Sequence, residues 1–362
     1  MNNFSGGEFT TRANLNRIIK YRGGLGVKKN RILILLTSLV LVLALSLTGI
    51  AAAKPFRVAM VTDIGGLSDK SFNDAAYDGM KKLQKDQGAE IKVVESSKME
   101  DYVPNLKSLA DQKYDMIWAI GFLMADSVKE VAKMYPNQKF GIIDSEVNVP
   151  NVVSVTFKEQ EGSFLVGVIA GIDSKKHKVG FVGGMEFPLI QKFEAGYKAG
   201  VKAVAPSTQV FTAYAGSFGD PAKGKELAMA QFTAYGADVV YQAAGATGLG
   251  VIAAAKAKGD GYWAIGVDKD QHAEGLVSNK DHVLACMVKR VDTGVYKATK
   301  AAIDGTFSGG KTIEYGLDDD GVGVCDNAKR TASKQALAKM EEFKKKIISG
   351  AIKVPVNPKD VK

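Results

Sequence analysis

The sequence predicts an α/β protein made of two lobes, each a parallel sheet covered on both faces by helices. From residue 55 onwards, short apolar runs typical of strands alternate with stretches typical of helices, which is the pattern of βαβ units. The alternation restarts near residue 159, so the chain of 362 residues holds two similar halves, each of domain size. The halves are similar in pattern rather than in sequence, and we infer no sequence repeat.

The expected elements follow in order along the chain. In the first half, strands are expected at residues 57–62, 91–95, 116–120, 140–143 and 152–156, with helices at 75–85, 102–112 and 127–135. In the second half, strands are expected at 178–182, 209–214, 239–242, 262–267 and 283–288, with helices at 161–171, 187–204, 221–235, 251–258 and 292–303. Late strands are expected at 312–316 and 323–324, before an amphipathic closing helix at 332–349.

These elements suggest a division of the chain into four parts. Residues 1–54 are expected to be an export signal or an N-terminal anchor. The N-terminal lobe is expected to comprise 55–158 and 284–312, and the C-terminal lobe 159–283 and 313–330. Residues 331–362 are expected to form the closing helix and a polar tail.

The leader has the composition of a targeting segment. Lys28, Lys29 and Arg31 precede an uncharged apolar run over 32–53. Its last residues, 51–53, are alanines that suit signal-peptidase cleavage, but the run is also long enough to remain as a membrane anchor. Either outcome places the rest of the chain outside the cytoplasm. Residues 1–26 are unusual for a leader, and we hypothesise that Val27 is the true start, which N-terminal sequencing of the precursor would test.

Most of the positive net charge of the chain comes from this leader. Residues 1–54 carry eight Lys or Arg and one acid, whereas residues 55–362 carry 40 basic and 38 acidic residues. The body is therefore nearly neutral, and its mixed charges give no indication of a nucleic-acid surface. The two cysteines, Cys286 and Cys325, both lie in the exported part, where either a disulfide or two buried thiols is compatible with the sequence.

One stretch concentrates the functional signals. The expected strand at 57–62 runs into a two-glycine turn and then into residues that favour a helix start. Ligands of open α/β sheets bind beyond the carboxyl ends of the strands. The candidate ligand contacts in this stretch are Asp63, Ser71, Phe72 and Asn73. Taken alone, Phe72 is equally compatible with a core anchor and with a platform for a ligand.

Three further acids follow other strands and loops. Asp126, Asp144 and Asp268 stand where a carboxylate can accept hydrogen bonds from a ligand, although Asp also caps helices. Gly245 opens a glycine-rich loop after the strand at 239–242, where backbone can approach a ligand. The loop lacks the dinucleotide-binding spacing.

Enzyme signatures are weak. Residues 305–312 match the spacing of a P-loop, but a helix is expected before them and an extended stretch after them, which is the reverse of the P-loop context. We therefore expect a turn there. The three histidines show no metal-ligand spacing, and no nucleophile elbow is present, so neither catalysis nor a cofactor is expected.

Four motifs in order resemble the basic membrane protein family. They are residues 63–73 (DIGGLSDKSFN), 121–126 (GFLMAD), 183–196 (GGMEFPLIQKFEAG) and 266–271 (GVDKDQ). This family comprises substrate-binding proteins of ATP-driven importers and includes purine-nucleoside receptors. The resemblance extends from about residue 55 to the closing helix. It implies the type I periplasmic binding protein fold, in which two doubly wound lobes are joined by three hinge crossings and enclose a ligand cleft.

The resemblance also implies roles for single residues. Phe72 and Phe193 match the two aromatic residues that sandwich the base in nucleoside-binding members, and Asn73 and Asp126 match contacts to the base edge. The positions that match sugar contacts are Asp268 and Lys289 for the ribose and Gly245 for a backbone contact, while Asp63 and Ser71 line the same edge of the first lobe. Phe187 precedes a proline and is interpreted as a packing residue.

The chain departs from the family in one respect. Members are commonly lipoproteins with a cysteine after Leu-x-Gly, but here Leu47-Thr48-Gly49 is followed by Ile50. A freely exported protein or a retained anchor is expected in place of a lipoprotein. The resemblance implies an extracytoplasmic purine-nucleoside-binding protein that works with the permease and ATPase subunits of an ABC importer. The alternatives are a sensing module that presents its closed form to a signalling receptor, or a binder of another planar or sugar-like ligand.

Overall fold

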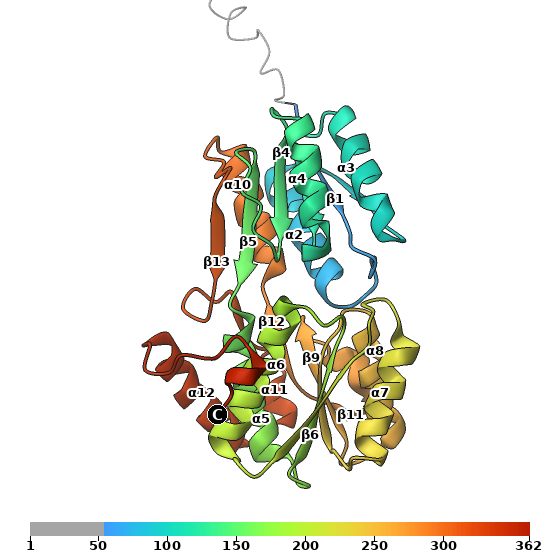
Figure 1. The fold of residues 1–362 in the computed structure, drawn as a ribbon, viewed down its shortest axis with the longest axis vertical. Helices are drawn as coiled ribbons and strands as arrows, with labels where there is room; N and C mark the ends of the chain where they lie inside the picture. The colour runs from blue at the N-terminus through green and yellow to red at the C-terminus, as the bar shows by residue number, and fades with distance from the viewer. Residues whose placement is uncertain (1–53) are drawn as a thin grey trace, which may run out of the picture. The chain divides into compact units, whose positions relative to one another are not determined.

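Two six-stranded sheets form the framework of the described part of the chain, residues 54–362 of a computed structural model (Figure 1). The strands in both sheets are parallel, except that β14 (Val322–Val324) pairs antiparallel with β12 (Val283–Lys289). These sheets confirm the predicted α/β class. The expected leader and its cleavage site lie outside the described residues, apart from Lys54.

The first sheet has the strand order β13-β5-β4-β3-β1-β2. Its strands are β1 (Arg57–Val61), β2 (Glu90–Val94), β3 (Met116–Ile120), β4 (Lys139–Ile143), β5 (Val152–Phe157) and β13 (Thr312–Tyr315). Its helices are α2 (Phe72–Gln87), α3 (Tyr102–Asp111), α4 (Ala125–Met134) and α10 (Val291–Ile303), with 3-10 turns η1 (Met99–Asp101) and η2 (Phe122–Met124).

Both faces of the first sheet are buried because successive side chains of a strand point to opposite sides. In β1, Val58 and Met60 contact the core beneath α2 and α10, while Ala59 and Val61 contact the core beneath α3 and α4. This explains why the strand is a continuous apolar run rather than an alternating one. The predicted doubly wound arrangement is confirmed here.

The second sheet has the order β14-β12-β9-β8-β6-β7. Its other strands are β6 (Lys178–Gly183), β7 (Gln209–Tyr214), β8 (Val239–Ala243) and β9 (Trp263–Asp268), and a hairpin adds β10 (Leu276–Val277) and β11 (Lys280–Asp281). The helical segments are α5 (Glu159–Asp173), α6 (Pro188–Val204), α7 (Pro221–Thr233), α8 (Thr247–Lys258), α9 (His272–Gly275), α11 (Ala328–Thr331), α12 (Lys334–Ile348) and η3 (Pro358–Asp360).

The chain passes between the two sheets at places that differ from the predicted boundaries. Residues 284–312 were expected in the first lobe, but β12 pairs with β9 in the second sheet, so the crossing falls at Arg290, before α10 packs on α2. Residues 313–330 were expected in the second lobe, but β13 pairs with β5 in the first sheet. By sequence alone, an apolar strand such as β12 is compatible with either sheet. Only the strand with which it pairs shows to which sheet it belongs.

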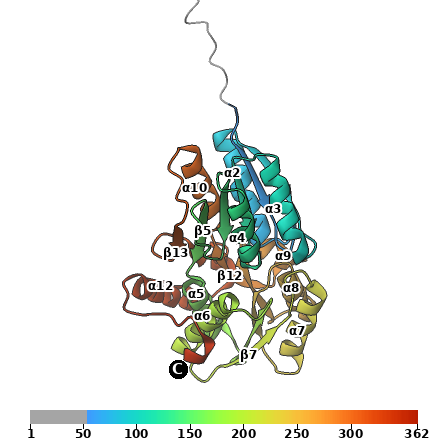
Figure 2. The same ribbon diagram turned by 45° about the horizontal axis from the view of Figure 1, so that its top comes forward.

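Two expectations about single segments are confirmed. The P-loop-like residues 305–312 connect α10 to β13, which is the turn context and not a strand-to-helix context. The closing helix forms as α12 and packs beside α5 in the second lobe (Figure 2). Among residues 54–362, no helix combines the length and apolar character that crossing a membrane requires.

Helices α5 and α6 cross with their backbones almost in contact, and glycines make this approach possible. A Cβ atom on Gly196 of α6 would lie 2.1 Å from the backbone oxygen of Gln160 in α5. A Cβ on Gly167 of α5 would likewise lie 2.3 Å from the backbone oxygen of Tyr197. Backbone atoms on both sides leave no flexible side chain that could move away.

We expect Gly196→Ala to lower the free energy of unfolding by about 1–3 kcal/mol, because overpacking forces the two helices apart. Urea unfolding of the two proteins would measure the loss. Gly323→Ala is the matched control, since a Cβ there meets nothing within 4 Å. An unchanged unfolding midpoint for the Gly196 variant would contradict the close-packed crossing.

Candidate ligand-binding site

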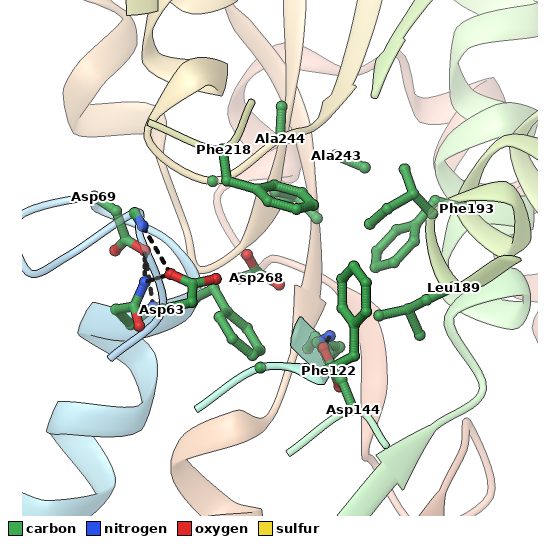
Figure 3. Close-up of a pocket in the computed structure, with 18 residues that line it drawn as sticks. Asp63, Asp69, Phe122, Asp144, Leu189, Phe193, Phe218, Ala243, Ala244 and Asp268 are labelled. Carbon is green, nitrogen blue, oxygen red and sulfur yellow. Dashed lines mark hydrogen bonds and ion pairs between the residues drawn. The ribbon is translucent and has the colours of Figure 1, made fainter. Parts of the chain in front are cut away.

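A cavity of about 50 Å³ lies beyond the carboxyl ends of strands from both sheets (Figure 3). It adjoins β1 and β3 in the first sheet and β6 and β8 in the second. At these pairs the order in which strands are added to the sheet reverses, and open α/β sheets bind ligands at such switch points. Its lining residues are Asp63, Gly65, Asp69, Phe72, Asn73, Gly121, Phe122, Asp144, Leu189, Ile190, Phe193, Phe218, Ala243, Ala244, Gly245, Val267, Asp268 and Lys289.

The apolar part of the lining consists mainly of phenylalanine rings. Phe72 and Phe193, predicted as a pair from segments far apart in sequence, both lie near the same ammonium group. The Lys289 Nζ is 4.9 Å from the centroid of the Phe72 ring and 5.5 Å from that of Phe193. Two further rings, Phe122 and Phe218, pack edge to face with centroids 6.1 Å apart and occupy the space beside Phe193 (Figure 3).

Helix α2 begins at this cavity, and Asp69 rather than Ser71 caps it. The Asp69 carboxylate accepts hydrogen bonds from the backbone N–H groups of Ser71, Asn73 and Asp74, at 2.8–3.1 Å. The Ser71 side chain makes no capping bond. Its hydroxyl instead donates to Asp268 Oδ2 at 2.5 Å, so it links the first lobe to the second. Ser71 therefore occupies the N-cap position of α2, as its sequence context predicts, but its side chain does not cap the helix.

Asn73 is held in one orientation by its amide nitrogen. Nδ2 donates to Asp63 Oδ1 at 2.8 Å and to Asp69 Oδ2 at 3.2 Å, which fixes Oδ1 on the opposite side. That Oδ1 is buried and has no hydrogen-bond partner among residues 54–362. A buried amide oxygen without a partner is costly, which makes this atom of a cavity-lining residue a candidate hydrogen-bond acceptor.

A buried ion cluster closes the floor of the cavity. Lys289 Nζ lies 2.5 Å from Asp144 Oδ2 and 3.7 Å from Glu159 Oε1, and the three side chains are at most 4% exposed. Burial alone lowers the pKa of Lys289, but the carboxylates of Asp144, Glu159 and Asp268 raise it above its ordinary value. Lys289 therefore stays an ammonium, which can donate to a ligand oxygen.

Two lining carboxyls are only weakly acidic. Burial raises the pKa of Asp63 from 3.8 to about 6, against the hydrogen bond from Asn73, and raises that of Asp268 to about 6, against the attraction of Lys289. The folded chain thus takes up protons more readily than the unfolded chain between about pH 4 and 6. The two carboxyls reduce stability above about pH 6, and this cost is relieved as the pH falls towards 4.

Backbone conformation also singles out the strand-end acids. Asp144 follows β4 with φ 67°, and Asp268 is the last residue of β9 with φ 64°. Both lie in the left-handed region of backbone conformation, which residues other than glycine rarely adopt. Such conformations are typical of functional sites that orient a side chain. Gly245, after β8, has φ 57° and lies where a Cβ would be 3.3 Å from the Phe218 backbone oxygen, so a side chain there would be strained.

The structure brings most of the predicted residues together. Asp63, Phe72, Asn73, Phe193, Gly245, Asp268 and Lys289 line the cavity, and Ser71 contacts it through its hydrogen bond to Asp268. Asp126 does not line it. It lies exposed in the first turn of α4, at a shallow surface depression that also includes Lys129, while Phe122, four positions earlier, lines the cavity. A role of Asp126 at the base edge therefore stays a prediction without support from this geometry.

Several lining residues were missed by sequence reasoning. The sequence identifies Asp144 as a strand-end acid but assigns it no particular role. Phe122 follows the end of β3 as directly as Asp63 follows β1, so its position after the strand is the signal that indicates it. Phe218 and Leu189 carry no such signal, because their place depends on how the loop before α7 and the start of α6 fold over the second sheet.

The chemical groups of the described lining residues suit an organic ligand better than a metal ion. It offers carboxylate and amide oxygens, one ammonium group and aromatic rings, with no histidine or cysteine among the described lining residues. Aromatic rings bind the faces of planar groups, carboxylates accept from hydroxyl or N–H groups, and the ammonium donates to oxygen. The arrangement can therefore hold a small molecule that has both a planar ring and several polar substituents.

The fold and this cavity together define a two-lobe solute-binding protein. A solved solute-binding protein of an ABC transporter system from Aeropyrum pernix superposes with a TM-score of 0.76 at 29% identity, covering 83% of this chain and 94% of that one. The profile of the family described as ABC transporter substrate-binding protein PnrA-like matches residues 56–358. The chain belongs to this family, as the sequence motifs predicted.

Relatives in sequence agree with this assignment. The chain is similar to the CD4+ T-cell-stimulating antigen of Listeria monocytogenes, at 44% identity over 85% of this chain and 90% of that one. It is also similar to the ABC transporter nucleoside-binding protein BmpA of Lactococcus lactis, at 39% identity over 83% of this chain and 89% of that one. The chain is therefore a substrate-binding protein of the ABC transporter class, whose members act outside the cytoplasm on small-molecule ligands together with membrane and ATPase subunits.

Proposed function

We propose that this protein binds a purine nucleoside in the cavity between its two sheets and delivers it to an ABC importer. The observation that carries the proposal is the convergence of two kinds of group on one cavity. Phe72 and Phe193 supply aromatic faces, and Asp268 and Lys289 supply a carboxylate and an ammonium within reach of the same space. The name of the Lactococcus lactis relative supports a nucleoside as the ligand class.

In this proposal the base lies between Phe72 and Phe193, and the free Oδ1 of Asn73 accepts a hydrogen bond from a base N–H. Asp268 accepts from the ribose hydroxyls, and Lys289 donates to a ribose oxygen. Stacking contributes about 1–3 kcal/mol per base and tolerates base identity, so the polar groups at the base edge set specificity. No step of this scheme needs a catalytic group or a cofactor.

The lobes must separate before a nucleoside can enter. The cavity of about 50 Å³ is far smaller than the roughly 300 Å³ or more of a site for a ligand of this size. Ser71 and Asp268 join the lobes across it, and the Phe122 ring lines it. A ribose hydroxyl would replace the Ser71 hydroxyl as a donor to Asp268, while the Phe122 ring turns away as the lobes close around the ligand.

A thermal-shift panel tests the proposal. The protein is unfolded and refolded to remove any co-purified ligand, then melted with adenosine, guanosine or inosine, the matching free bases, ribose and arabinose. A ligand that binds only the folded state stabilises it by about 2.7 kcal/mol at one hundred times Kd. We expect a clear shift with at least one nucleoside and little with bases or sugars. A shift with sugars alone would reject the nucleoside and favour a carbohydrate ligand.

Phe193→Ala is expected to weaken the binding of all purine nucleosides by a similar factor, about 5- to 150-fold, because stacking does not depend on base identity. Calorimetric titration with adenosine, guanosine and inosine would measure the change. Tyr235→Ala is a suitable control, since that ring is 51% exposed and does not line the cavity. Unchanged affinity in the Phe193 variant would remove this ring from the site.

Nucleoside affinity is expected to fall as the pH drops through about 6. Protonation of Asp268, whose pKa is raised to about 6, leaves a carboxylic acid that no longer accepts on both oxygens. Binding favours the ionised form, so affinity should be constant above about pH 7 and about tenfold weaker at pH 5. Titrations at pH 5 and 7.5 would measure this ratio, and equal affinities would contradict the acceptor role.

A further inference from the structure

A second cluster of reactive side chains lies in the second lobe, outside the lining of the ligand cavity. Asp270 lies in the turn after β9, and His272 is the first residue of α9. Cys286 lies in β12, and Cys325 follows directly after β14. One possible ligand atom of each lies within 4.8 Å of those of the others. Both cysteines are buried free thiols, which resolves the alternatives that the sequence left open in favour of thiols in this structure.

The hydrogen bonds of His272 show which ring nitrogen faces the cluster. The Thr331 hydroxyl donates its hydrogen to the Leu284 carbonyl oxygen at 2.8 Å, so it can only accept at its 3.2 Å contact with His272 Nε2. Nε2 therefore carries a hydrogen, and in the neutral ring Nδ1 carries the lone pair. Nδ1 lies 3.8 Å from the sulfur atoms of both Cys286 and Cys325.

This tautomer leaves two acceptors facing each other. Nδ1 of His272 is 2.7 Å from Asp270 Oδ1, and a lone pair and a carboxylate oxygen at this distance need a positive centre between or beside them. That centre is either a proton on Nδ1 or a cation that both atoms coordinate. The two nearby sulfur atoms favour a cation, because thiolate and imidazole together are preferred ligands of zinc.

Both sulfur atoms also have the outer contacts that thiolate ligands use. The Gln271 backbone N–H donates to Cys286 Sγ at 3.2 Å, and the Cys286 backbone N–H donates to Cys325 Sγ at 3.1 Å. Such N–H donors stabilise negative charge on sulfur, and Thr331 orients the imidazole from its other nitrogen. The arrangement thus has a set of outer hydrogen bonds as well as possible ligands.

We propose that Cys286, Cys325 and His272 Nδ1, with the Asp270 carboxylate as the fourth ligand, bind a thiophilic divalent cation such as Zn²⁺. In tetrahedral zinc sites the metal lies about 2.3 Å from sulfur and 2.0–2.1 Å from nitrogen, which places those ligand atoms about 3.6 Å apart. The sulfur-to-nitrogen distances of 3.8 Å are already close to this value. Each thiol that coordinates the cation releases its proton to solvent.

The cluster is accessible and lies next to the ligand site. Asp270 is 35% exposed, and with Cys325 it lines a surface groove of about 530 Å³ through which a cation can enter. Asp270 is two residues after Asp268, the proposed ribose contact. A cation would tie this turn to β12 and to the residue after β14, and would hold the backbone that carries Asp268.

The test uses the full-length chain, purified in mild detergent and reductant on a tag without histidines, then loaded with Zn²⁺ and desalted. We expect elemental analysis to find about one zinc ion per chain. The Cys286→Ser/Cys325→Ser variant should lose it, and so should His272→Ala. His177→Ala is the matched control and should keep the full amount, because His177 lies in a turn outside the cluster.

A second measurement needs no variant and so does not depend on their folding. Co²⁺ bound to the wild-type chain should give the strong visible bands of tetrahedral coordination and a sulfur-to-cobalt charge-transfer band in the near ultraviolet. Wild-type chain that retains no zinc and gives no such bands would overturn the proposal. So would equal zinc content in the cysteine variant, or an intact mass showing a disulfide that persists in reductant.

Discussion

Lys289→Met is expected to lower the melting temperature by about 10 °C and to abolish nucleoside binding. The Lys289 ammonium is buried between Asp144 and Glu159. Its removal leaves the Asp144 carboxylate without a countercharge and leaves Glu159 paired only with the more exposed Lys192, at 3.3 Å. Breaking a buried pair in this way costs about 3–5 kcal/mol, and each kcal/mol corresponds to roughly 2–4 °C for a chain of this size. Differential scanning calorimetry would measure the shift.

The pH dependence of that loss distinguishes charge burial from lost packing. Burial already raises the pKa of Glu159 above its ordinary value, while Lys289 lowers it, so removing the ammonium should raise it further. The variant should then recover stability as the pH falls and the carboxyls become protonated. A control, Lys280→Met, removes an exposed pair with Asp260 and should have almost no effect. A Lys289 variant that melts like the wild type at pH 8 would contradict this role.

Asp268→Asn is expected to weaken nucleoside binding about 10- to 150-fold while leaving the binding of free bases nearly unchanged. Asparagine keeps the shape and tolerates the φ of 64°, but it removes the charge that would accept the ribose hydroxyls. Hydrogen bonds to a charged group contribute about 1.5–3 kcal/mol, which sets the expected range. Calorimetric titration with a nucleoside and its free base would measure the two effects.

The free base acts as an internal control in this experiment, because a misfolded or locked cavity would lose both ligands together. Asp260→Asn provides a control for the charge change alone, since Asp260 pairs with Lys280 on the surface. Equal losses of nucleoside and base affinity in Asp268→Asn would assign Asp268 to holding the lobes together through Ser71 rather than to the ribose.

The fold could be predicted from sequence because its signals are local. Each strand is a short apolar run and each helix shows its own period, so β1, α2 and their successors were found close to their actual bounds. The partner of a strand is not a local property. β12 and β13 were assigned to the wrong lobes because an apolar run contains no information on which sheet it joins. The hairpin β10–β11 was missed because each of its strands has only two residues, which is too short to show a period.

The candidate site was predictable where motif and strand end coincide. Asp63, Phe72, Asn73, Phe193 and Asp268 reach the cavity because each ends or follows a strand or lies in the first turns of the next helix. The same rule does not predict which side of the helical turn a given side chain points to. Asp126 and Phe122 lie only one turn apart, yet Phe122 faces the cavity and Asp126 faces solvent. Likewise, Asp69 caps α2 while the Ser71 hydroxyl donates to Asp268, and Asp268 is almost two hundred residues away in the sequence.

A crystal structure of the protein soaked or co-crystallised with a purine nucleoside tests the central claim most directly. We predict the base between the rings of Phe72 and Phe193, with ribose hydroxyls within hydrogen-bond distance of Asp268 and an oxygen of the ribose near Lys289. The Ser71 hydroxyl should have left Asp268, and the Phe122 ring should have moved out of the cavity. A cavity that stays empty at saturating nucleoside, or a nucleoside bound elsewhere, would contradict the proposed function.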